Sequence, residues 1–517
     1  MNGADRLCDE LLANDVDVCF ANPGTSEMHF VAALDRKPRM RCVLGLFEGV
    51  VTAAADGYAR MADKPAATLL HLGPGLANGL ANLHNARRAR TPMINVVGDH
   101  ATYHLQHDAP LTSDIESLAR PMSQWVRRIA DPESVGPDTA AAYQAAMSLP
   151  GVATLILPAN AAWGEIADTP VTRAVLPEPQ AIDGDIMRHA VEAIKAGRRT
   201  ALLMTGRALR ADALEIAGRI AETAGVRLLA QTSNGRIERG AGRVSVTKVL
   251  YPVDQAVAAL QDIDVLILVG AKAPVAFFAY PGKPGILTRD DCEILELARP
   301  GQDLKEALAW LADELGAKAG AASSSPKLPS DDEILPSGAL TEDAISIAVA
   351  RMMPENAIVC DESLTSARRF FALSDNAPPH DYLSLTGGAI GIGTPLAAGA
   401  AVACPDRKVI GLQADGSGMY TVQGLWTQAR ENLDIVTIVF SNRTYAILHG
   451  EMRNVGVNEF GRNARRMLNI DEPALDWVSL AKGMGVEGGR ATTVEEFVKL
   501  FAGALSRKGP FLIEAVL

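Results

Sequence analysis

The feature that most constrains this chain is a regular alternation of short apolar runs with helix-like stretches along almost its whole length. Such alternation is typical of repeated βαβ units, in which parallel strands are buried between helices. We therefore predict an α/β protein with parallel sheets flanked by helices. The clearest strand-like runs are 16–21, 67–70, 93–97, 153–157, 201–204, 265–269, 358–360, 408–413, 435–440 and 511–515.

Two breaks in composition divide the 517 residues into three segments of similar size. Residues 168–179 are polar and rich in proline, and residues 316–332 combine small residues, serine and proline, as linkers do. The length agrees with a prior of roughly three or four domains. We predict an N-terminal domain at 1–167, a central domain at 180–315, a linker at 316–335 and a C-terminal domain at 336–517.

Charge and composition exclude several classes of protein. The formal net charge is −12, so affinity for nucleic acid is not expected. No apolar run reaches the roughly 18 residues that a membrane span needs. The first residues lack a cationic and apolar leader, so we expect a cytoplasmic protein. The six cysteines are scattered without a CxxC pair, so neither a zinc site nor a disulfide framework is expected.

A polar motif follows each of two neighbouring strand-like runs near the C-terminus. Asp415-Gly416-Ser417-Gly418 follows the run 408–413, and Asn442 stands 27 positions after Asp415, behind the run 435–440. Ligands of open parallel sheets bind at this edge. Carboxylate and amide oxygens suit Mg²⁺, and small residues let backbone N–H groups approach a phosphate. The motif predicts a metal-bridged diphosphate site, with two ordinary strand-end turns as the alternative.

This spacing resembles the diphosphate signature of thiamine diphosphate (ThDP) enzymes, in which Gly-Asp-Gly is followed by a distant Asn. Ala414 replaces the first glycine here, a position that makes no metal contact in the family. The resemblance implies that Mg²⁺ is bound by Asp415, Asn442 and the backbone carbonyl of Thr444. It also implies that Gly416 and Ser417 contact the diphosphate of the cofactor.

A second match to the same family lies near the N-terminus. Glu48 precedes a stretch of small residues, 51–60, that ends in Gly-Tyr-Ala-Arg. ThDP enzymes carry a glutamate at this point. The resemblance implies that Glu48 hydrogen-bonds to the aminopyrimidine ring and favours its imino tautomer, which removes the proton from the thiazolium C2. Such a group works in a dry site with a tuned pKa. The alternative is that Glu48 only caps the next helix.

The resemblance covers the whole chain and implies its assembly. It identifies the three predicted domains as pyrimidine-binding, central and diphosphate-binding, with ThDP lying between the first domain of one subunit and the last domain of another. A homodimer would be the minimal active unit, and we expect a homotetramer. The stretch after the run 201–204 has no convincing dinucleotide fingerprint, so FAD is not expected.

A glycine-rich segment at 386–395 matches the loop that shapes the cofactor in this family. The resemblance implies that Ile390 props ThDP into its bent form and that Gly388 offers a backbone carbonyl to the aminopyrimidine amine. Glycines on either side let the chain pass close to a ligand. The alternative is a plain strand-to-helix loop in which Pro395 opens the helix.

The residues 22–27, Asn-Pro-Gly-Thr-Ser-Glu, resemble the turn of benzoylformate decarboxylases whose serine contacts the substrate carboxylate. Thr25 and Ser26 stand at this place, with an N-cap pair as the alternative. His71 follows the run 67–70, where those enzymes carry an active-site histidine. It is predicted to transfer a proton or orient a small 2-oxo acid, with a structural histidine as the alternative.

Two further segments are candidates for the substrate pocket. Residues 98–108 hold three of the nine histidines, and Gln106, His104 and His107 are the candidates there, since the family places a substrate-lining loop at this point. The HxxH spacing leaves a metal site as an alternative. Leu448, which follows the predicted metal ligand Asn442 in the chain, is predicted to form an apolar wall of the substrate pocket.

Two absences bear on the reaction. The stretch 273–280 lacks the second histidine of benzoylformate decarboxylases. Leu448 replaces a glutamate of pyruvate decarboxylases, and no His-His pair exists. Fewer proton donors favour decarboxylation followed by carboligation, as in acetolactate synthases. A non-ligating decarboxylase of the benzoylformate decarboxylase type and a ThDP-binding subunit with little catalysis remain the alternatives.

Overall fold

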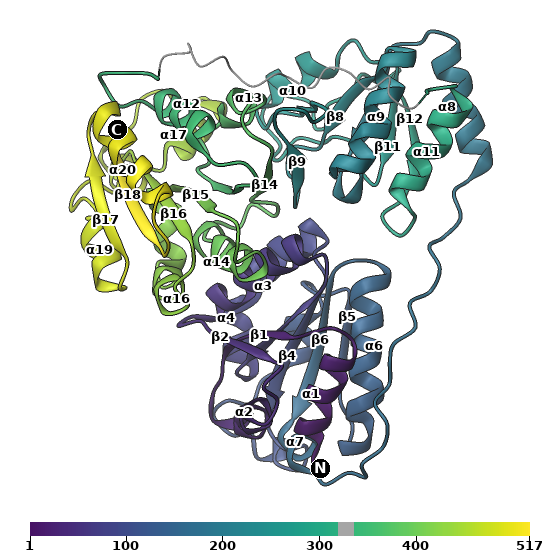
Figure 1. The fold of residues 1–517 in the computed structure, drawn as a ribbon, viewed down its shortest axis with the longest axis vertical. Coiled ribbons are helices and arrows are strands. Elements are labelled where there is room, and N and C mark those ends of the chain that lie inside the picture. Colours follow the sequence, from purple (N-terminus) through teal and green to yellow (C-terminus); the bar gives the residue numbers. More distant parts are fainter. Residues whose placement is uncertain (319–334) are drawn as a thin grey trace.

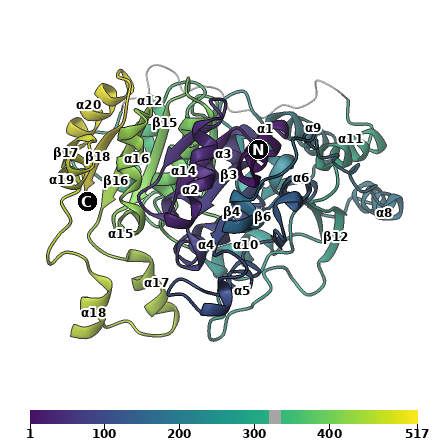
Figure 2. The same ribbon diagram turned by 90° about the horizontal axis from the view of Figure 1, so that it is seen from below.

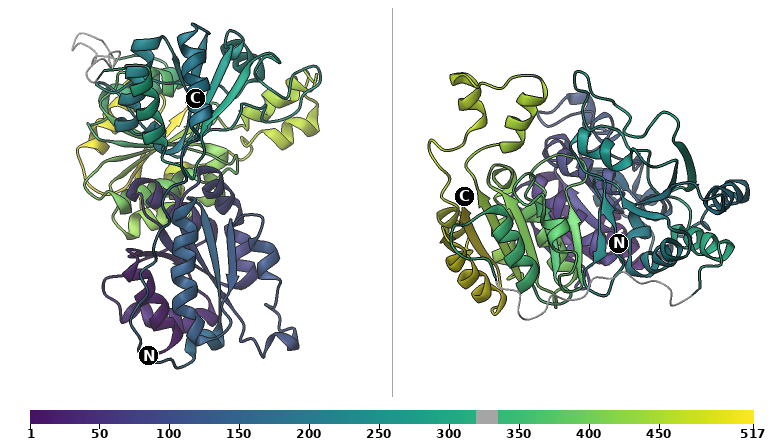
Figure 3. Two further views of the ribbon diagram at one scale, coloured as in Figure 1. Left: turned by 90° about the vertical axis from the view of Figure 1, so that its right-hand side faces the viewer. Right: turned by 90° about the horizontal axis from the view of Figure 1, so that it is seen from above.

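The structure is a computed structural model that describes residues 1–318 and 335–517. Its three sheets are covered by helices, which confirms the predicted α/β fold (Figure 1). All ten predicted runs overlap observed strands. Residues 319–334, most of the predicted linker, lie outside the described residues. The central and C-terminal sheets lie side by side at one end of the molecule, and the N-terminal sheet lies at the other (Figure 3).

The N-terminal sheet has six parallel strands in the order β2-β1-β3-β4-β6-β5. Strands β3, β4 and β6 are buried along their whole length because helices cover both faces. The strands are β1 (Val18–Asn22), β2 (Arg41–Leu44), β3 (Ala66–Leu70), β4 (Met93–Asp99), β5 (Trp125–Arg128) and β6 (Val152–Pro158). The helices are α1 (Gly3–Ala13), α2 (Met28–Asp35), α3 (Glu48–Ala62), α4 (Leu72–Ala89), α5 (Ile115–Ala119), α6 (Val135–Ser148) and α7 (Ala159–Trp163).

The central sheet has five parallel strands in the order β10-β8-β7-β11-β12. Residues 167–183, which include the predicted proline-rich break, form no helix or strand and run up to it along one side of the molecule (Figure 1). The strands are β7 (Thr200–Met204), β8 (Arg227–Ala230), β10 (Thr247–Lys248), β11 (Val265–Val269) and β12 (Glu293–Ala298). The helices are α8 (Gly184–Lys195), α9 (Ala211–Ala224), α10 (Val253–Leu260) and α11 (Leu304–Glu314).

The C-terminal sheet has seven strands in the order β17-β18-β16-β15-β13-β14-β9. All pairs are parallel except that of β9 with β14. The strands are β13 (Ile358–Glu362), β14 (His380–Ser384), β15 (Val409–Ala414), β16 (Ile435–Ser441), β17 (Glu487–Ala491) and β18 (Phe511–Val516). The helices are α12 (Glu342–Met352), α13 (Phe370–Leu373), α14 (Gly393–Ala403), α15 (Asp415–Gly418), α16 (Gly424–Arg430), α17 (Ala446–Asn454), α18 (Arg462–Leu468), α19 (Trp477–Gly483) and α20 (Val494–Leu505).

The edge strand β9 (Ile237–Arg239) comes from the range predicted for the central domain. It pairs with β14 through Ile237 and Tyr382, Glu238 and Asp381, and Arg239 and His380. The central segment therefore supplies one strand of the C-terminal sheet.

The N-terminal and C-terminal domains meet where α3 packs against α14 (Figures 1 and 2). Two glycines allow the helices to touch through their backbones. A Cβ at Gly57 would overlap the carbonyl of Leu396, and a Cβ at Gly399 would overlap that of Ala54. This close contact explains the small residues that the sequence carries at 51–60.

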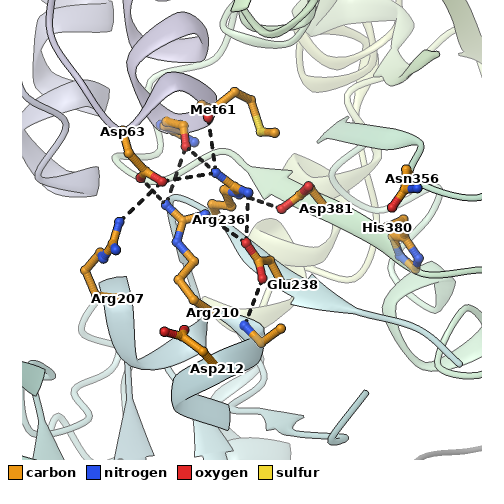
Figure 4. Close-up of polar contacts among 12 residues, drawn as sticks. Met61, Asp63, Arg207, Arg210, Asp212, Arg236, Glu238, Asn356, His380 and Asp381 are labelled. Carbon is orange, nitrogen blue, oxygen red and sulfur yellow. Dashed lines mark hydrogen bonds and ion pairs between the residues drawn. The ribbon is translucent and has the colours of Figure 1, made fainter. Parts of the chain in front are cut away.

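An ion-pair network joins all three domains next to this contact (Figure 4). Arg236 beside β9 donates to Asp381 on β14 at 2.5 Å and to backbone carbonyls at the end of α3. Asp63, just after α3, accepts from Arg210 of the central domain at 2.8 Å. Burial alone would raise the pKa of Asp381, but Arg236 and Arg407 beside it hold that pKa below its ordinary value. The network fixes the domains relative to one another.

Candidate active site

The predicted diphosphate residues lie at the ends of β15 and β16. Because these strands are parallel neighbours, Asp415 and Asn442 meet at one edge of the sheet. The Asp415 carboxylate accepts the backbone N–H of Gly416 at 2.8 Å and that of Arg443 at 2.6 Å. The side-chain oxygen of Asn442 accepts the N–H of Thr444 at 3.1 Å. Local hydrogen bonds thus orient both predicted ligands.

These oxygens fit a hard cation that also binds a diphosphate. Burial raises the pKa of Asp415 against the opposing effect of its two backbone donors, and a bound cation would favour the charged carboxylate. Within residues 1–318 and 335–517, no three His, Cys, Asp or Glu side chains form a group that could hold a metal. A cation here would therefore depend on Asp415, Asn442 and main-chain oxygen, with the cofactor's phosphates; the carbonyl of Thr444 stays a prediction.

The small residues of the motif have separate uses. A Cβ at Gly416 would overlap the ring of Tyr445. The hydroxyl of Ser417 is buried; it accepts from Gln413 at 2.8 Å and donates to the carbonyl of Ala414 at 3.2 Å. The Ser417 hydroxyl is thus engaged inside the sheet, so a diphosphate would meet the backbone N–H groups of this turn.

The predicted cofactor loop is held from the N-terminal domain. Gly388 has a φ of +78°, which favours glycine, and Ile390 follows it. Asn85 on α4 accepts the N–H of Gly387 at 3.0 Å and donates to the carbonyl of Ala389 at 2.7 Å. Nothing in the local sequence marks Asn85 for this role, since its partners in the cofactor loop lie about three hundred positions away.

Glu362, the last residue of β13, also holds the predicted cofactor loop at 386–395. Its carboxylate accepts the backbone N–H groups of Gly391 at 2.6 Å, Ile392 at 3.1 Å and Gly393 at 2.8 Å. The side chain of Gln413 donates to it at 3.0 Å. Burial raises the pKa of Glu362, and the four donors partly offset that effect. An acidic residue ending a buried strand was the only signal that could have indicated this role.

The other predicted catalytic residues lie together in the N-terminal domain. Glu48 begins α3, and its carboxylate accepts from Asn78 at 3.0 Å. Gly75 separates Glu48 from His71. A Cβ at Gly75 would lie 3.2 Å from Glu48 Oε1 and 3.3 Å from His71 Cβ. The structure therefore brings Glu48 and His71 to either side of the first turn of α4.

His71 is oriented by a buried carboxylate. Its Nδ1 lies 2.7 Å from Glu27 Oε2 and 3.3 Å from Ser26 Oγ. Glu27 also accepts the N–H of Gly24 at 2.8 Å and the hydroxyl of Ser26. A proton on Nδ1 is therefore donated to Glu27, which leaves Nε2 for a ligand. The sequence indicated only a helix start at Glu27, because its pairing with His71 spans 44 residues.

A cavity of about 360 Å³ lies beside His71. The predicted residues Thr25, Ser26 and His104 line it. The full lining comprises Thr25, Ser26, Met28, His29, His71, Leu72, His100, Ala101, Tyr103, His104, Leu111, Ala159 and Trp163.

Three predicted substrate residues, Gln106, His107 and Leu448, lie outside this lining. Gln106 donates its side-chain amide to the carbonyl of Tyr103 at 2.9 Å, and Leu111 occupies the wall of the cavity instead. Leu448 lies on α17, which has no buried residue and projects with α18 from the C-terminal domain (Figure 2). The side chain of Leu448 is 40% exposed. Their contacts with a substrate stay predictions.

The structure thus presents two half-sites on separate domains. Among the described residues, no hydrogen bond or ion pair joins the side chain of Glu48 or His71 to Asp415 or Asn442. The first group carries carboxylates and imidazoles, and the second carries oxygen ligands for a cation and its diphosphate. Such a division fits a cofactor that spans two domains.

Comparisons with known proteins give the class of protein that this fold and site define. Residues 1–118 match the thiamine pyrophosphate enzyme N-terminal TPP binding domain, and residues 364–515 match the C-terminal TPP binding domain. The chain belongs to the family of ThDP-dependent enzymes that includes acetolactate synthases and benzoylformate decarboxylases.

Three relatives show how far the similarity extends. The chain is 49% identical over 517 residues to a Mycobacterium tuberculosis protein named "Putative acetolactate synthase large subunit IlvX", covering all of this chain and 99% of that protein. It is 28% identical to benzoylformate decarboxylase of Pseudomonas aeruginosa, covering 96% and 95% of the two chains. The structure of a ThDP-dependent 4-hydroxybenzoylformate decarboxylase from Rhodococcus jostii RHA1 superposes with a TM-score of 0.83 at 25% identity, covering 99% and 98%.

Within the described part of the chain, no helix is long and apolar enough to cross a membrane.

Proposed function

We propose that this protein decarboxylates a 2-oxo acid with ThDP and Mg²⁺ and joins the product to a second carbonyl compound, as acetolactate synthases do. The observation that carries the proposal is the placement of Glu48 beside His71, whose Nδ1 is held by the buried Glu27. This arrangement supplies a carboxylate for the cofactor ring and an oriented imidazole for the substrate.

The residues present fit the cofactor. When bound, ThDP supplies the carbon nucleophile that adds to the oxo group and takes up the electron pair released with CO₂. Asp415 and Asn442 would hold Mg²⁺ and through it the diphosphate. Glu48 would accept a hydrogen bond from the pyrimidine ring, and Ile390 would support the bent form above the loop that Glu362 fixes.

The central domain supports ligation over simple release of an aldehyde. Residues 273–280 contain no histidine, and they present Phe277 to the cofactor loop. The Phe277 ring lies 2.9 Å from the position of a Cβ at Gly388 and 5.3 Å from the ring of Tyr251. A pocket wall without a histidine at this point would slow protonation and leave time for a second carbonyl compound to react.

A second candidate is a decarboxylase that releases a free aldehyde. It is favoured by the imidazoles of His29, His71, His100 and His104, which all line one cavity. The two reactions are separated by supplying a panel of 2-oxo acids and identifying the products by mass. A hydroxyketone supports ligation, whereas aldehyde alone supports the decarboxylase. A third candidate is a ThDP-binding subunit with little catalysis, and it requires that almost no CO₂ is released. The metal requirement of the proposed enzyme is tested separately, by removing Mg²⁺ with a chelator and measuring CO₂ release.

The experiment that tests the catalytic assignment is Glu48→Gln. Loss of acid–base assistance typically costs about 10²- to 10⁴-fold in rate, so CO₂ release is expected to fall by that factor while ThDP still binds. Glu133→Gln, at an exposed position in the same domain, is the matched control. A Glu48→Gln variant as active as the parent would contradict the proposal.

The assembly can be tested with complementary variants. Because the two half-sites lie on separate domains, a site shared between subunits predicts that Glu48→Gln and Asp415→Ala are each inactive but regain activity when mixed as a heterodimer. Absence of any recovery in a verified heterodimer would place both half-sites in one chain. The homodimer, the homotetramer and the cytoplasmic location stay predictions, and no FAD is proposed.

A further inference from the structure

Among the residues that the structure describes, four cationic side chains and no aspartate or glutamate line a cavity of about 490 Å³, which we call the basic cavity. Arg87 and Arg88 lie in the last turn of α4, and Arg90 is the C-cap of that helix. Lys272 comes from the central domain, shortly after β11. None of the four side chains makes a hydrogen bond or ion pair with a described residue. The basic cavity therefore holds four positive charges that no protein group neutralises at short range.

The dipole of α4 explains only part of this cluster. Cations are stabilised at a helix C-terminus, which gives Arg87 and Arg88 a structural use. Lys272 belongs to another domain, and Arg90 is half-buried, so that desolvation lowers its pKa. Glu296 acts on Arg90 only from a distance and is itself paired with Arg299 at 2.8 Å. Like charges that share one cavity repel one another, and an anionic occupant would offset that repulsion.

The lining of the basic cavity indicates which anion it suits. Thr232 and Ser233, which follow β8, add two hydroxyl groups to the four cations. A carboxylate offers two oxygens and one charge, whereas a phosphate group offers three oxygens and nearly two charges. The volume lies within the roughly 300–1,000 Å³ of small-molecule sites. A small organic phosphate therefore matches both the charge and the size of the basic cavity.

The basic cavity borders the predicted cofactor loop at 386–395. Thr386, the first residue of that loop, lines the cavity. Phe277 also lines it, and the Phe277 ring lies 2.9 Å from the position of a Cβ at Gly388. Arg88 lies about one turn of α4 beyond Asn85, which holds the loop. Ligation needs room for a second carbonyl compound, and the basic cavity offers it on the central-domain side of the loop.

We propose that the basic cavity binds the phosphate group of the second carbonyl compound, so that the acceptor in the ligation is a phosphorylated aldehyde or ketone. The assignment rests on the proposed function and deepens it, since it names the class of the second substrate. In the reaction, the donor carbon left after loss of CO₂ forms a C–C bond to the acceptor's carbonyl carbon. The π electron pair of that carbonyl moves to its oxygen, which takes up a proton. The phosphate is held by Arg87, Arg88 and Lys272 and is not transferred.

Binding of two non-reacting probes tests the site on the holoenzyme loaded with ThDP and Mg²⁺. Glycerol 3-phosphate carries the phosphate but no carbonyl group, and glycerol lacks the phosphate. By titration calorimetry, the parent should bind only the first. Because hydrogen bonds between charged groups are strong, the double variant Arg88→Gln, Lys272→Gln should bind glycerol 3-phosphate about 10- to 100-fold more weakly.

Two further variants separate charge from packing. The exchange variant Arg88→Lys, Lys272→Arg keeps both charges and should retain most of the affinity for glycerol 3-phosphate. Arg39→Gln removes an exposed arginine of the N-terminal domain outside the cavity lining and should behave like the parent. In turnover, glyceraldehyde 3-phosphate should be a better acceptor than glyceraldehyde. The double variant should raise KM for the phosphorylated acceptor much more than it lowers kcat.

Equal affinities of the parent and the double variant for glycerol 3-phosphate would overturn the assignment. Equal use of the two aldehydes by the parent would also overturn it, and so would much tighter binding of ADP than of glycerol 3-phosphate, which would make the basic cavity a nucleotide site. Failure of the proposed function has a different signature, because a parent protein that releases no CO₂ from any 2-oxo acid can still be titrated with glycerol 3-phosphate.

Discussion

Replacing Glu362 by glutamine should destabilise the protein and weaken ThDP binding together. Each oxygen of Glu362 accepts two hydrogen bonds, from backbone N–H groups of 391–393 and the side chain of Gln413. An amide nitrogen in place of either oxygen would face two donors and leave both unpaired. Each buried unpaired donor costs about 1–3 kcal/mol, and loss of the buried charge offsets part of the sum. We expect a net loss of about 2–3 kcal/mol.

Urea unfolding measures the loss in stability. Fluorescence of Trp477, which packs against Gly418 in the diphosphate turn, follows binding of ThDP. The matched control is Glu355→Gln, an exposed glutamate in the turn before β13, which should leave both quantities unchanged. If Glu362→Gln unfolds at the same urea concentration as the parent and binds ThDP equally well, then the carboxylate does not hold the loop and the reasoning is refuted.

Two further predictions concern stability. Gly399→Ala places a Cβ on the carbonyl of Ala54 and should destabilise the protein by about 1–3 kcal/mol or more, because α3 and α14 become overpacked. The control Gly450→Ala has open space around the new Cβ and should not destabilise the protein. Thermal unfolding of both variants checks this, and equal melting temperatures would contradict it. Burial, aided by nearby Arg239, lowers the pKa of His380 from 6.5 to about 3. Between pH 6.5 and pH 3 the unfolded chain therefore binds a proton at His380 that the folded protein does not bind. The free energy of unfolding is unaffected by His380 above pH 6.5 and falls as the pH drops toward 3, by at most about 1.4 kcal/mol per pH unit. Urea unfolding across this range should show a shallower pH dependence in His380→Phe, and an unchanged slope would contradict the assignment.

The parts of the fold that were predicted from the sequence are those with a local signal. Buried parallel strands appear in the sequence as apolar runs, and Asp415 and Asn442 directly follow two of these runs. Their meeting follows from the pairing of β15 with β16, which chain order alone made plausible. Glu48 was predicted from the stretch of small residues that follows it. These residues form α3, and they are small because α3 packs closely against α14.

The residues that escaped prediction act over long distances in the chain. Asn85 holds a loop 304 residues away, and Glu27 orients His71 from the neighbouring strand end. Neither side chain differs in its local surroundings from an ordinary polar residue on a helix. Within residues 98–108, the family resemblance indicated Gln106, but the side-chain amide of Gln106 donates to the carbonyl of Tyr103, and Leu111 lies at the cavity instead. Loop geometry of this kind depends on packing that the sequence pattern does not display.

The short strand β9 limits how this architecture can be taken apart or recombined. It belongs to the central segment in chain order, but it covers the outer edge of β14. Excising the central domain, or exchanging it for that of a relative as a self-contained cassette, would strip that edge and expose unpaired backbone groups of the kind that promote strand-to-strand aggregation. Any transplant of the central domain must therefore leave residues 237–239 with the C-terminal sheet, so the unit of exchange is smaller than the segment between the two breaks in composition.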